Sequence, residues 1–409
     1  MRTVEEQLAD VMASVRHLPS EDVPIERALG RTTATSVRAT VPIPVFDNSA
    51  MDGYAVRIAD LADASDANPI ALRIVADVPA GAASDPAIGP GETARIMTGA
   101  PMPSDADGVV PVEDTVEGFT AAIGASVRIL EAARLGAHIR RAGADALVGD
   151  EVVAAGMLVT PLQTSALAAA SVPTVAVARR PRVAIISTGS ELRPPGSLLE
   201  RGQIPESNSL VLLGLVADTG AEVVLRESVS DDPADLVAAL ARAFDADADA
   251  VIMSGGVSEG AYEPVKNSLA GVMEFTKVAM QPGKPQGFGV SDAGALLFGF
   301  PGNPVSVAVS FECFARPALL AMQGRAEIER PRITLRAATD WRTPPGRRQY
   351  LPAAIDRSDP AAWTVRPATA GGSGSHLAGG LARAEAFAVV PAGVEAVRAG
   401  DPIDVMLLS

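Results

Sequence analysis

Hydrophobic and polar positions between residues 181 and 304 repeat one unit four times: a short apolar run, a turn, and a stretch of helical length. The apolar runs cover 181–187, 222–229, 250–254 and 295–300, and the helical stretches cover 208–218, 233–244, 263–269 and 304 to about 322. Buried strands that alternate with helices in this way predict parallel βαβ units with right-handed crossovers. We therefore expect a parallel α/β domain over residues 181–326.

The turns after these four runs hold glycine, hydroxyl, acidic or proline residues. Such residues are common in turns, so one of these turns alone would not indicate a site. The carboxyl ends of parallel strands share one sheet edge, where ligands bind, so the four turns together predict a binding site. Its candidate residues are Ser187, Thr188, Gly189, Glu191, Asp231, Asp232, Gly255, Gly256, Ser258, Glu263, Pro301, Gly302, Asn303 and Pro304.

The pattern on both sides of this stretch is mostly β-like. Thr3 and Glu6 have capping-box spacing at the start of a helix that should run to about His17. Alternating segments between 70 and 130 predict a small inserted β domain, which we place at 44–140. Similar short segments after residue 323 predict a β barrel or sandwich over 327–409. Segments 1–43 and 141–180 hold short strand and helix pieces and form the remaining linker domain.

The composition excludes several classes of protein. The chain has 409 residues and a formal net charge of −15, without a basic run, which argues against nucleic acid or an anionic membrane as partner. Acidic residues follow the start at once, which is unlike a signal peptide. The uncharged run 293–311 is about as long as a membrane span, but Pro301 and Pro304 interrupt it, so it predicts a strand, a turn and a helix.

Cysteine and histidine give no metal or disulfide signal. The single cysteine, Cys313, excludes internal disulfides and suits a reducing cytoplasm. Cys313 lies in an apolar helical pattern, which indicates a buried structural thiol rather than a nucleophile. The three histidines are scattered, without the spacing of metal ligands.

Lysine, in contrast, is rare and clustered. The 34 basic residues are 31 arginines and three lysines, Lys266, Lys277 and Lys284, which fall within 19 residues. A compact ammonium group suits a phosphate or another small oxyanion. Three surface lysines placed by chance are the alternative, and the glycine turn just before them favours the anion site.

Two segments stay open on local chemistry alone. The run 46–55, FDNSAMDGYA, fits a turn-rich domain junction and a ligand loop equally well. The stretch 371–376, GGSGSH, is typical of a flexible loop but could also bind phosphate through its backbone N–H groups.

Several motifs together resemble a known family. FDNSAMDGYA, RIMTGAPMP, DGVVPVEDT, IRRAGAD, PRVAIISTGSEL, SGGVSEG, KVAMQPGKP, GFPGNPVS and GSGSH occur in this order over about 330 residues. This ordered set is similar to that of the molybdopterin molybdenumtransferases, the bacterial MoeA proteins and the E domain of gephyrin. The resemblance implies four parts: an elongated segment, an inserted β domain, a molybdopterin-binding-type α/β domain and a C-terminal β barrel. It also implies a homodimer with each site near the subunit interface.

The resemblance also implies an activity and its residues. Members insert molybdenum from molybdate into adenylylated molybdopterin with Mg²⁺, giving the molybdenum cofactor and AMP. Molybdopterin adenylyltransferase would act upstream, and molybdoenzyme apoproteins or chaperones would receive the product. The implied catalytic residues are Asp52, Thr98, Asp145, Glu191, Asp231, Lys266 and Lys277; Lys284, Arg347 and Ser375 join the turn residues in binding substrate. Glu191, Asp231 and Asp232 could supply carboxylate oxygens to Mg²⁺.

Three positions depart from the family pattern. Glu263 stands where many members have Asp, Gln281 replaces a frequent lysine, and Pro352 stands where a basic residue is common. These departures leave the choice between molybdate and tungstate open.

Two other functions remain as alternatives. Molybdopterin adenylyltransferases share a similar α/β domain but lack the FDNSAMDGYA segment and the inserted domain. A non-enzymatic dimeric scaffold or cofactor carrier is the other alternative, which the likeness to gephyrin allows.

Overall fold

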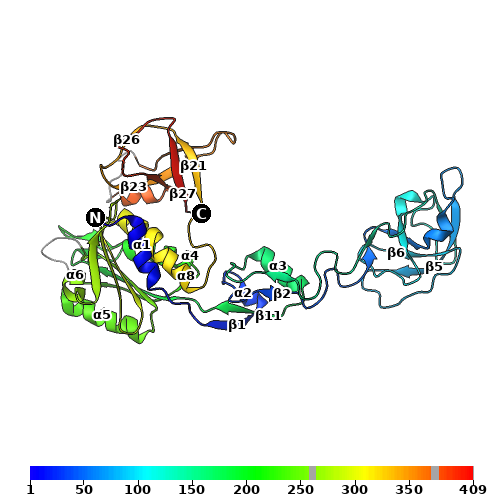
Figure 1. Cartoon of the computed structure of the whole chain (residues 1–409), viewed down its shortest axis with the longest axis horizontal. Helices are drawn as coiled ribbons and strands as arrows, with labels where there is room; N and C mark the ends of the chain where they lie inside the picture. Colours follow the sequence, from blue (N-terminus) through cyan, green and yellow to red (C-terminus); the bar gives the residue numbers. More distant parts are fainter. Residues whose placement is uncertain (258–263, 370–376, 409) are drawn as a thin grey trace.

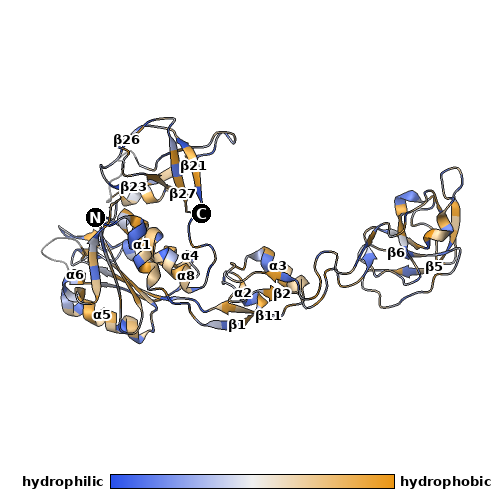
Figure 2. Cartoon of the chain, in the orientation of Figure 1, coloured by the Kyte–Doolittle hydropathy of each residue, from blue (hydrophilic) through white to orange (hydrophobic). Residues whose placement is uncertain are grey.

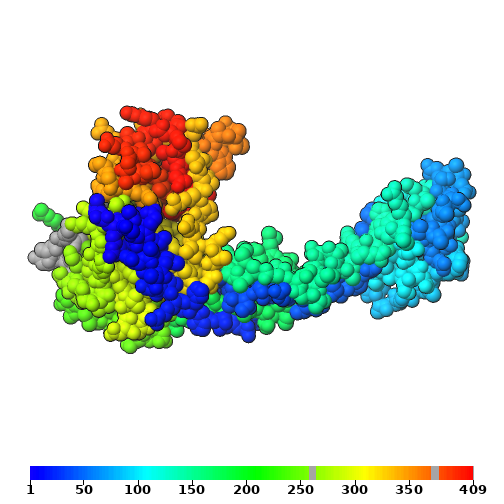
Figure 3. All heavy atoms as spheres, in the orientation of Figure 1, coloured from blue at the N-terminus to red at the C-terminus, as the bar shows by residue number. Residues whose placement is uncertain are grey.

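The computed structural model describes residues 1–257, 264–369 and 377–408. Figure 1 shows a long molecule, with an inserted β domain at one end, a small middle part, and an α/β domain beside a C-terminal barrel at the other end. The space-filling view shows the narrow middle part that joins the two ends (Figure 3). Figure 2 shows hydrophobic residues spread over all of these parts, in keeping with several separate cores.

The α/β domain contains the four predicted parallel strands. Its six-stranded sheet has the order β15-β12-β16-β20-β19-β17. The parallel strands are β12 (Arg182–Thr188), β15 (Glu222–Val229), β16 (Ala250–Ser254) and β20 (Leu296–Phe300), and the helices between them are α4 (Asn208–Asp218), α5 (Pro233–Asp245) and α6 (Pro264–Leu269). The predicted parallel βαβ fold is confirmed.

Two further strands in this sheet escaped prediction. β17 (Met273–Lys277) and β19 (Pro285–Val290) pair with each other in antiparallel register, and β19 pairs antiparallel with β20. Their sequences mix charged residues and glycines with few apolar positions, so no strand period stands out. Lys277 pairs with Pro285 in this register, which places Lys277 at the same edge as the carboxyl ends of the parallel strands.

The sheet buries both faces with alternating side chains. Val183 and Ile185 of β12 face one core, shared with α1, α4 and the helix after β20, whereas Ala184 and Ile186 face a second core under α5 and α6. That helix comprises α7 (Pro304–Ser310), a π turn (Phe311–Ala315) and α8 (Arg316–Met322).

The segment 304–322 is long and apolar enough to cross a membrane, but 94% of an 18-residue apolar stretch within it is buried inside the protein. It is a core helix, as the prediction of a strand, turn and helix requires. Cys313 is buried in this helix, and burial raises the pKa of its thiol to about 12, which confirms the structural role expected for it.

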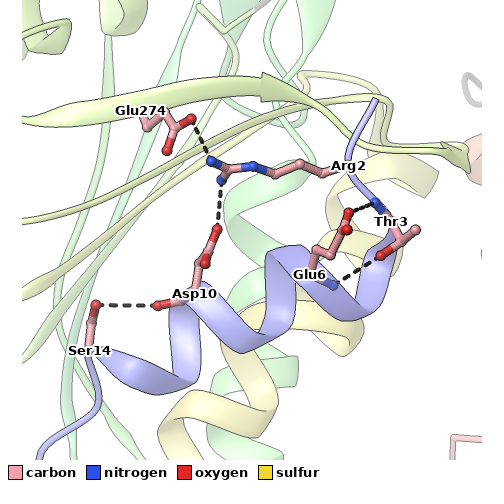
Figure 4. Close-up of polar contacts among 6 residues, drawn as sticks. All are labelled: Arg2, Thr3, Glu6, Asp10, Ser14 and Glu274. Atoms are coloured by element: carbon pink, nitrogen blue, oxygen red, sulfur yellow. Dashed lines mark hydrogen bonds and ion pairs between the residues drawn. The ribbon is translucent and has the colours of Figure 1, made fainter.

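Helix α1 (Val4–Ala13) begins with the predicted capping box, in which Thr3 and Glu6 exchange hydrogen bonds (Figure 4). The helix ends at Ala13, earlier than His17. Val4 and Val11 pack into the core of the α/β domain, so the chain enters that domain before it enters the linker domain. The sequence analysis assigns residues 1–43 to the linker domain, whereas this packing places helix α1 with the α/β domain.

The middle part and the inserted domain are built from short strands. The middle part holds β1 (Ser20–Pro24), α2 (Ile25–Ala28), β2 (Val37–Arg38), β10 (Glu151–Val153), α3 (Pro161–Ala169) and β11 (Thr174–Ala178). β3 (Asn48–Ser49) pairs with β9 (Ile139–Arg140) where the chain enters and leaves the inserted domain. The inserted sheet has the order β7-β4-β6-β5-β8, with β4 (Gly53–Val56), β5 (Ile70–Val78), β6 (Glu92–Ile96), β7 (Gly108–Pro111) and β8 (Ser126–Ile129).

The C-terminal part is the predicted barrel. Its pairings close a ring of five strands, β23 (Arg348–Asp356), β24 (Thr364–Pro367), β21 (Arg332–Ala337), β27 (Pro402–Leu407) and β25 (Ala386–Val390). The short strand β18 (Met280–Gln281) of the α/β domain pairs in parallel with β23. The smaller elements are β13 (Leu192–Arg193), β14 (Ile204–Pro205), β22 (Trp341–Arg342), β26 (Ala396–Val397) and α9 (Ala378–Leu381), with single 3₁₀ turns at Ile58–Leu61 and Val112–Asp114.

Candidate active site

A pocket of about 840 Å³ opens at the carboxyl edge of the α/β sheet. Turns after β12, β15, β16 and β20 all contribute to its wall, as expected for a parallel sheet. Of the predicted site residues, those that line it are Thr188, Gly189, Glu191, Asp231, Gly255, Gly256, Lys284, Pro301, Gly302, Asn303 and Pro304. Ser258, Glu263 and Ser375 lie outside the described residues.

Glycines let these turns approach one another closely. A Cβ atom built on Gly255 would lie 2.5 Å from the carbonyl oxygen of Thr188, and Gly255 also has a left-handed φ of 94°. A Cβ atom on Gly302 would lie 3.5 Å from the Cα of Gly255. Three strand ends therefore meet through backbone contacts at the floor of the pocket.

Two predicted residues have structural partners instead of a place in the pocket wall. Ser187 is buried, and its hydroxyl donates to Glu206 Oε1 at 2.9 Å. Asp232 caps helix α5 by accepting a hydrogen bond from the Ala234 N–H at 2.8 Å. Both side chains support the turns that carry the pocket.

The acidic residues of the pocket are Glu191 and Asp231. Asp231 accepts a hydrogen bond from the Ser190 N–H at 2.9 Å, which ties the turn after β15 to the turn after β12. Among the described residues, no group of three or more His, Cys, Asp or Glu side chains is arranged to hold a metal ion. The structure thus does not gather Glu191, Asp231 and Asp232 into a three-carboxylate site.

The three lysines lie around this edge at different depths. Lys284 is half-buried and lines the pocket. Lys266 lies in α6, where its backbone N–H donates to the Gly256 carbonyl at 3.0 Å. Lys277 is exposed at the end of β17 and lines a separate shallow hollow with Arg2 and Glu6. The lysines are not dispersed over the molecule, but only Lys284 lines the main pocket.

Arg347 of the C-terminal barrel reaches the pocket through Gln281 of the α/β domain. Arg347 donates a hydrogen bond from Nη1 to Gln281 Oε1 at 2.6 Å, and Gln281 lines the pocket. Ala378 at the start of α9 lines it as well. Gln281 thus joins the arginine of the barrel to the pocket wall. The sequence showed only that a glutamine replaces a frequent lysine here, which did not indicate this contact.

Other residues of the pocket were missed. Asn208 is the clearest case, because its side-chain amide donates to the Gly302 carbonyl at 2.7 Å and so fixes the turn after β20. The polar run just before helix α4 was the available signal, but it follows the two-residue strand β14 and none of the four apolar runs. The remaining missed residues are Leu192, Ile204, Pro205, Ser207, Val257, Pro282, Gly283, Pro285 and Ser306.

Asp52 and Thr98 form a pair in the inserted domain. Asp52 Oδ1 accepts hydrogen bonds from the Thr98 N–H at 2.7 Å and from the Thr98 hydroxyl at 2.8 Å. These bonds, the backbone one first, lower the pKa of Asp52, so it is ionised at neutral pH. Asp145 is exposed between β9 and β10, and its backbone N–H donates to the Ile43 carbonyl at 2.9 Å.

The inserted domain does not meet the pocket of its own chain. Figure 1 shows β5 and β6 at the opposite end of the molecule from α5 and α6. Thr98 lies two residues after the end of β6, so the Asp52–Thr98 pair lies at that distant end. One chain therefore does not bring all the predicted catalytic residues together.

Comparisons with known proteins cover the whole chain. Three family models match in order: the MoeA N-terminal region (domains I and II) over residues 2–171, a probable molybdopterin-binding domain over 184–321, and the MoeA C-terminal region (domain IV) over 334–408. Molybdopterin molybdenumtransferase 2 of Mycobacterium tuberculosis is 42% identical over 413 residues, which span 99% of each chain. Molybdopterin molybdenumtransferase of a Nostoc species is 36% identical over 398 residues, covering 95% of this chain and 89% of the relative.

Solved structures agree with the sequence matches. The crystal structure of a molybdopterin biosynthesis MoeA protein from Pyrococcus horikoshii OT3 superposes with a TM-score of 0.83 over 100% of both chains, at 27% identity. The order of domains, the inserted sheet and the terminal barrel are thus shared along the full length. On these matches, the chain belongs to the MoeA family.

Proposed function

We propose that this chain transfers molybdenum from molybdate to adenylylated molybdopterin and releases AMP. The observation that carries the proposal is the pocket at the carboxyl edge of the sheet, in a chain whose N-terminal and C-terminal parts match the MoeA models and whose α/β domain matches the molybdopterin-binding model. Relatives that bear the name molybdopterin molybdenumtransferase support the same reaction.

The charges around the pocket suit such substrates. Molybdate is a dianion, and adenylylated molybdopterin carries a phosphoanhydride, so binding must offset several negative charges. Lys284 lines the pocket, and Lys266, Lys277 and Arg347 lie around it in a protein that is otherwise strongly acidic. Backbone N–H groups of the glycine turns can add donors without adding charge.

Mg²⁺ fits the acidic residues of the same pocket. Glu191 and Asp231 both line it, and Mg²⁺ needs only one or two protein carboxylates beside substrate phosphates and water. Bound there, the ion would neutralise charge on the phosphoanhydride oxygens. Asp231 is already oriented by the Ser190 N–H, so its position does not depend on the ion.

A homodimer would complete the site. Asp52, Thr98 and Asp145 lie away from the pocket of their own chain, and a second copy related by twofold symmetry can supply them. Asp52, held ionised by Thr98, would then serve as a hydrogen-bond or proton acceptor at the mouth of the partner's pocket.

The surroundings of the reaction follow from the same proposal. The protein would act in the cytoplasm, between a molybdopterin adenylyltransferase and the molybdoenzyme apoproteins or chaperones that take the product. Its acidic surface offers nothing to nucleic acid.

The test is turnover by the purified full chain with adenylylated molybdopterin, Mg²⁺ and molybdate, with AMP and active cofactor measured together. Asp52→Ala and Lys266→Ala should lower turnover about 100-fold while the proteins stay folded. Asp63→Ala removes an exposed carboxylate from the same inserted domain and should leave turnover unchanged. Full activity of both site variants, or binding of the substrate without AMP release, would contradict the proposal.

A further inference from the structure

The segment from Lys277 to Pro285 carries two of the three lysines and one wall of the pocket, yet it contains little regular structure of its own. Its backbone is held from two sides. On one side, the Arg2 N–H donates to the Lys277 carbonyl at 2.9 Å and the Ala279 N–H donates to the Arg2 carbonyl at 2.8 Å. On the other, the Arg348 N–H of barrel strand β23 donates to the Ala279 carbonyl at 2.9 Å.

The side chain of Arg2 reinforces the first of these contacts. Its guanidinium donates to Asp10 of α1 and to Glu274 of β17, each at 2.7 Å (Figure 4). Glu274 lies three residues before Lys277 in the same strand. Arg2 therefore joins the first helix to the strand that ends in the lysine, in addition to pairing with the backbone that follows it.

Glu5, on the same helix, reinforces the second contact. Its carboxylate forms an ion pair with Arg348, the residue whose backbone holds Ala279. Partial burial acts against ionisation of Glu5, but the hydrogen bond from Arg348 and its charge prevail, so the pKa of Glu5 is lowered. Arg348 directly follows Arg347, which reaches Gln281 in the pocket wall.

We infer that Arg2 and Glu5 are positioning residues for the anion pocket. The ion pair of Arg2 with Glu274 joins the start of α1 to β17, and that of Glu5 with Arg348 joins it to β23, so both strands that contact the 277–285 segment are tied to the same helix. Together they set the place of Gln281 and Lys284, which line the pocket, and hence the affinity for the oxyanion. This inference rests on the proposed function, because it assumes that the pocket binds molybdate.

The experiment compares Arg2→Ala, Glu5→Ala and the double variant in the full chain, with molybdate as the titrated ligand. Because these ion pairs are partly exposed, each single change should weaken molybdate binding about fivefold, and the double change about tenfold or more. The KM for molybdate should rise by the same factor while kcat is kept. Arg2→Lys, which can reach only one carboxylate at a time, should restore part of the affinity.

Thr3→Ala is the matched control. It removes the hydroxyl that caps α1 and so weakens the same helix, but among the described residues Thr3 forms hydrogen bonds only within α1 and none to the 277–285 segment. It should lower the unfolding midpoint and leave molybdate affinity unchanged. If Thr3→Ala weakened binding as much as Arg2→Ala, the two residues would act only through helix stability and the inference would fail.

Hydrogen exchange separates this inference from the proposed function. The Ala279 amide should exchange faster in Arg2→Ala than in the wild type or in Thr3→Ala, with no ligand present. Unchanged exchange would overturn the positioning role, whatever the protein binds. A wild type that bound no molybdate would overturn the proposed function, while faster exchange at Ala279 would still support the positioning of the segment.

Discussion

The α/β domain and the inserted β domain each carry predicted catalytic residues, but they arrange them in opposite ways. In the α/β domain, turns from four strands converge on one pocket within a single chain. In the inserted domain, Asp52 and Thr98 form one hydrogen-bonded pair, exposed to solvent and far from that pocket. The described residues of the α/β domain form a pocket wall within one chain, whereas Asp52 and Thr98 are held to each other and line no part of that pocket.

The difference follows from topology. In a parallel sheet, strands far apart in sequence must end at the same edge, so their turns become neighbours without any specific contact between side chains. A mixed β sheet such as that of the inserted domain gives no such rule. Asp52 and Thr98 meet only because β4 and β6 pair next to each other, with Gly53 opposite Ile96. The pairing of these strands fixes the two side chains relative to each other, but it does not bring them to the pocket of the α/β domain.

The sharpest test of this contrast is complementation between two inactive variants. Lys284→Ala and Asp52→Ala should each lose about 100-fold in turnover, since each removes a charged group from one half of the site. If a site combines the pocket of one copy with the inserted domain of the other, a mixed dimer of the two variants holds one intact site. Random pairing in co-expressed protein should therefore restore about one quarter of wild-type turnover.

The control for this experiment pairs two variants of the same region. Lys284→Ala co-expressed with Lys266→Ala leaves an altered α/β domain at every site, so no activity should return. Recovery in this control, or no recovery when Lys284→Ala is co-expressed with Asp52→Ala, would show that the pocket and the inserted domain do not share a site across a dimer.

Glycine substitutions give a smaller effect that also separates the two regions. Gly255 and Gly99 both have left-handed backbones, with φ of 94° and 81°, but a Cβ on Gly255 would strike the Thr188 carbonyl whereas one on Gly99 would meet nothing within 4 Å. Gly255→Ala should lower the free energy of unfolding of the α/β domain by about 2–3 kcal/mol. Gly99→Ala should cost its own domain only about 1 kcal/mol of backbone strain. Denaturant titrations can measure both values, and equal costs would show that close approach at the strand ends is unimportant.

The hydrophobic pattern predicted more of the first region than of the second. The apolar runs predict β12, β15, β16 and β20, and the rule that parallel strands end at one sheet edge then predicts Glu191, Asp231 and Gly255 at one site. The hairpin of β17 and β19 could not be predicted in the same way, because Gly287 and Gly289 replace side chains at its centre and hide the strand period. Because this hairpin was not predicted, Lys284 was the only residue of the pocket wall between 281 and 285 that the sequence analysis assigned to the site.

Local chemistry left FDNSAMDGYA undecided between a domain junction and a ligand loop, and the structure shows features of a junction. Asn48 and Ser49 form the short strand β3 at the entry to the inserted domain, and Gly53 begins β4. The side chain of Asp52 nevertheless points to a specific partner, Thr98, 46 residues further along the chain. Only the family resemblance indicated that both residues belong to a site, and nothing in the sequence indicated their hydrogen bond, since no period or spacing within one element connects them.

The smallest expected effect concerns the ionisation of Asp52. Thr98→Val removes the hydroxyl donor but keeps the backbone N–H, so the pKa of Asp52 should rise toward its ordinary value without reaching it. Because the pKa of Asp52 is lowered, its hydrogen bonds to Thr98 stabilise the folded protein when the carboxylate is ionised. This stabilisation is lost as the pH falls through the lowered pKa. In Thr98→Val the loss should therefore begin at a higher pH, and the acid limb of the turnover profile should move the same way.

Ser104 and Asp85 provide the matched pair for this measurement. Asp85 accepts a hydrogen bond from the Ser104 N–H at 2.9 Å, and its pKa is lowered by the backbone and side chain of Ser104, as that of Asp52 is by Thr98. In Ser104→Ala, carboxyl chemical shifts should report a raised pKa for Asp85 alone, with the turnover profile unchanged. If the acid limb moved equally in both variants, the titrating group would not be Asp52, and the inserted domain would act only as a structural support for the dimer.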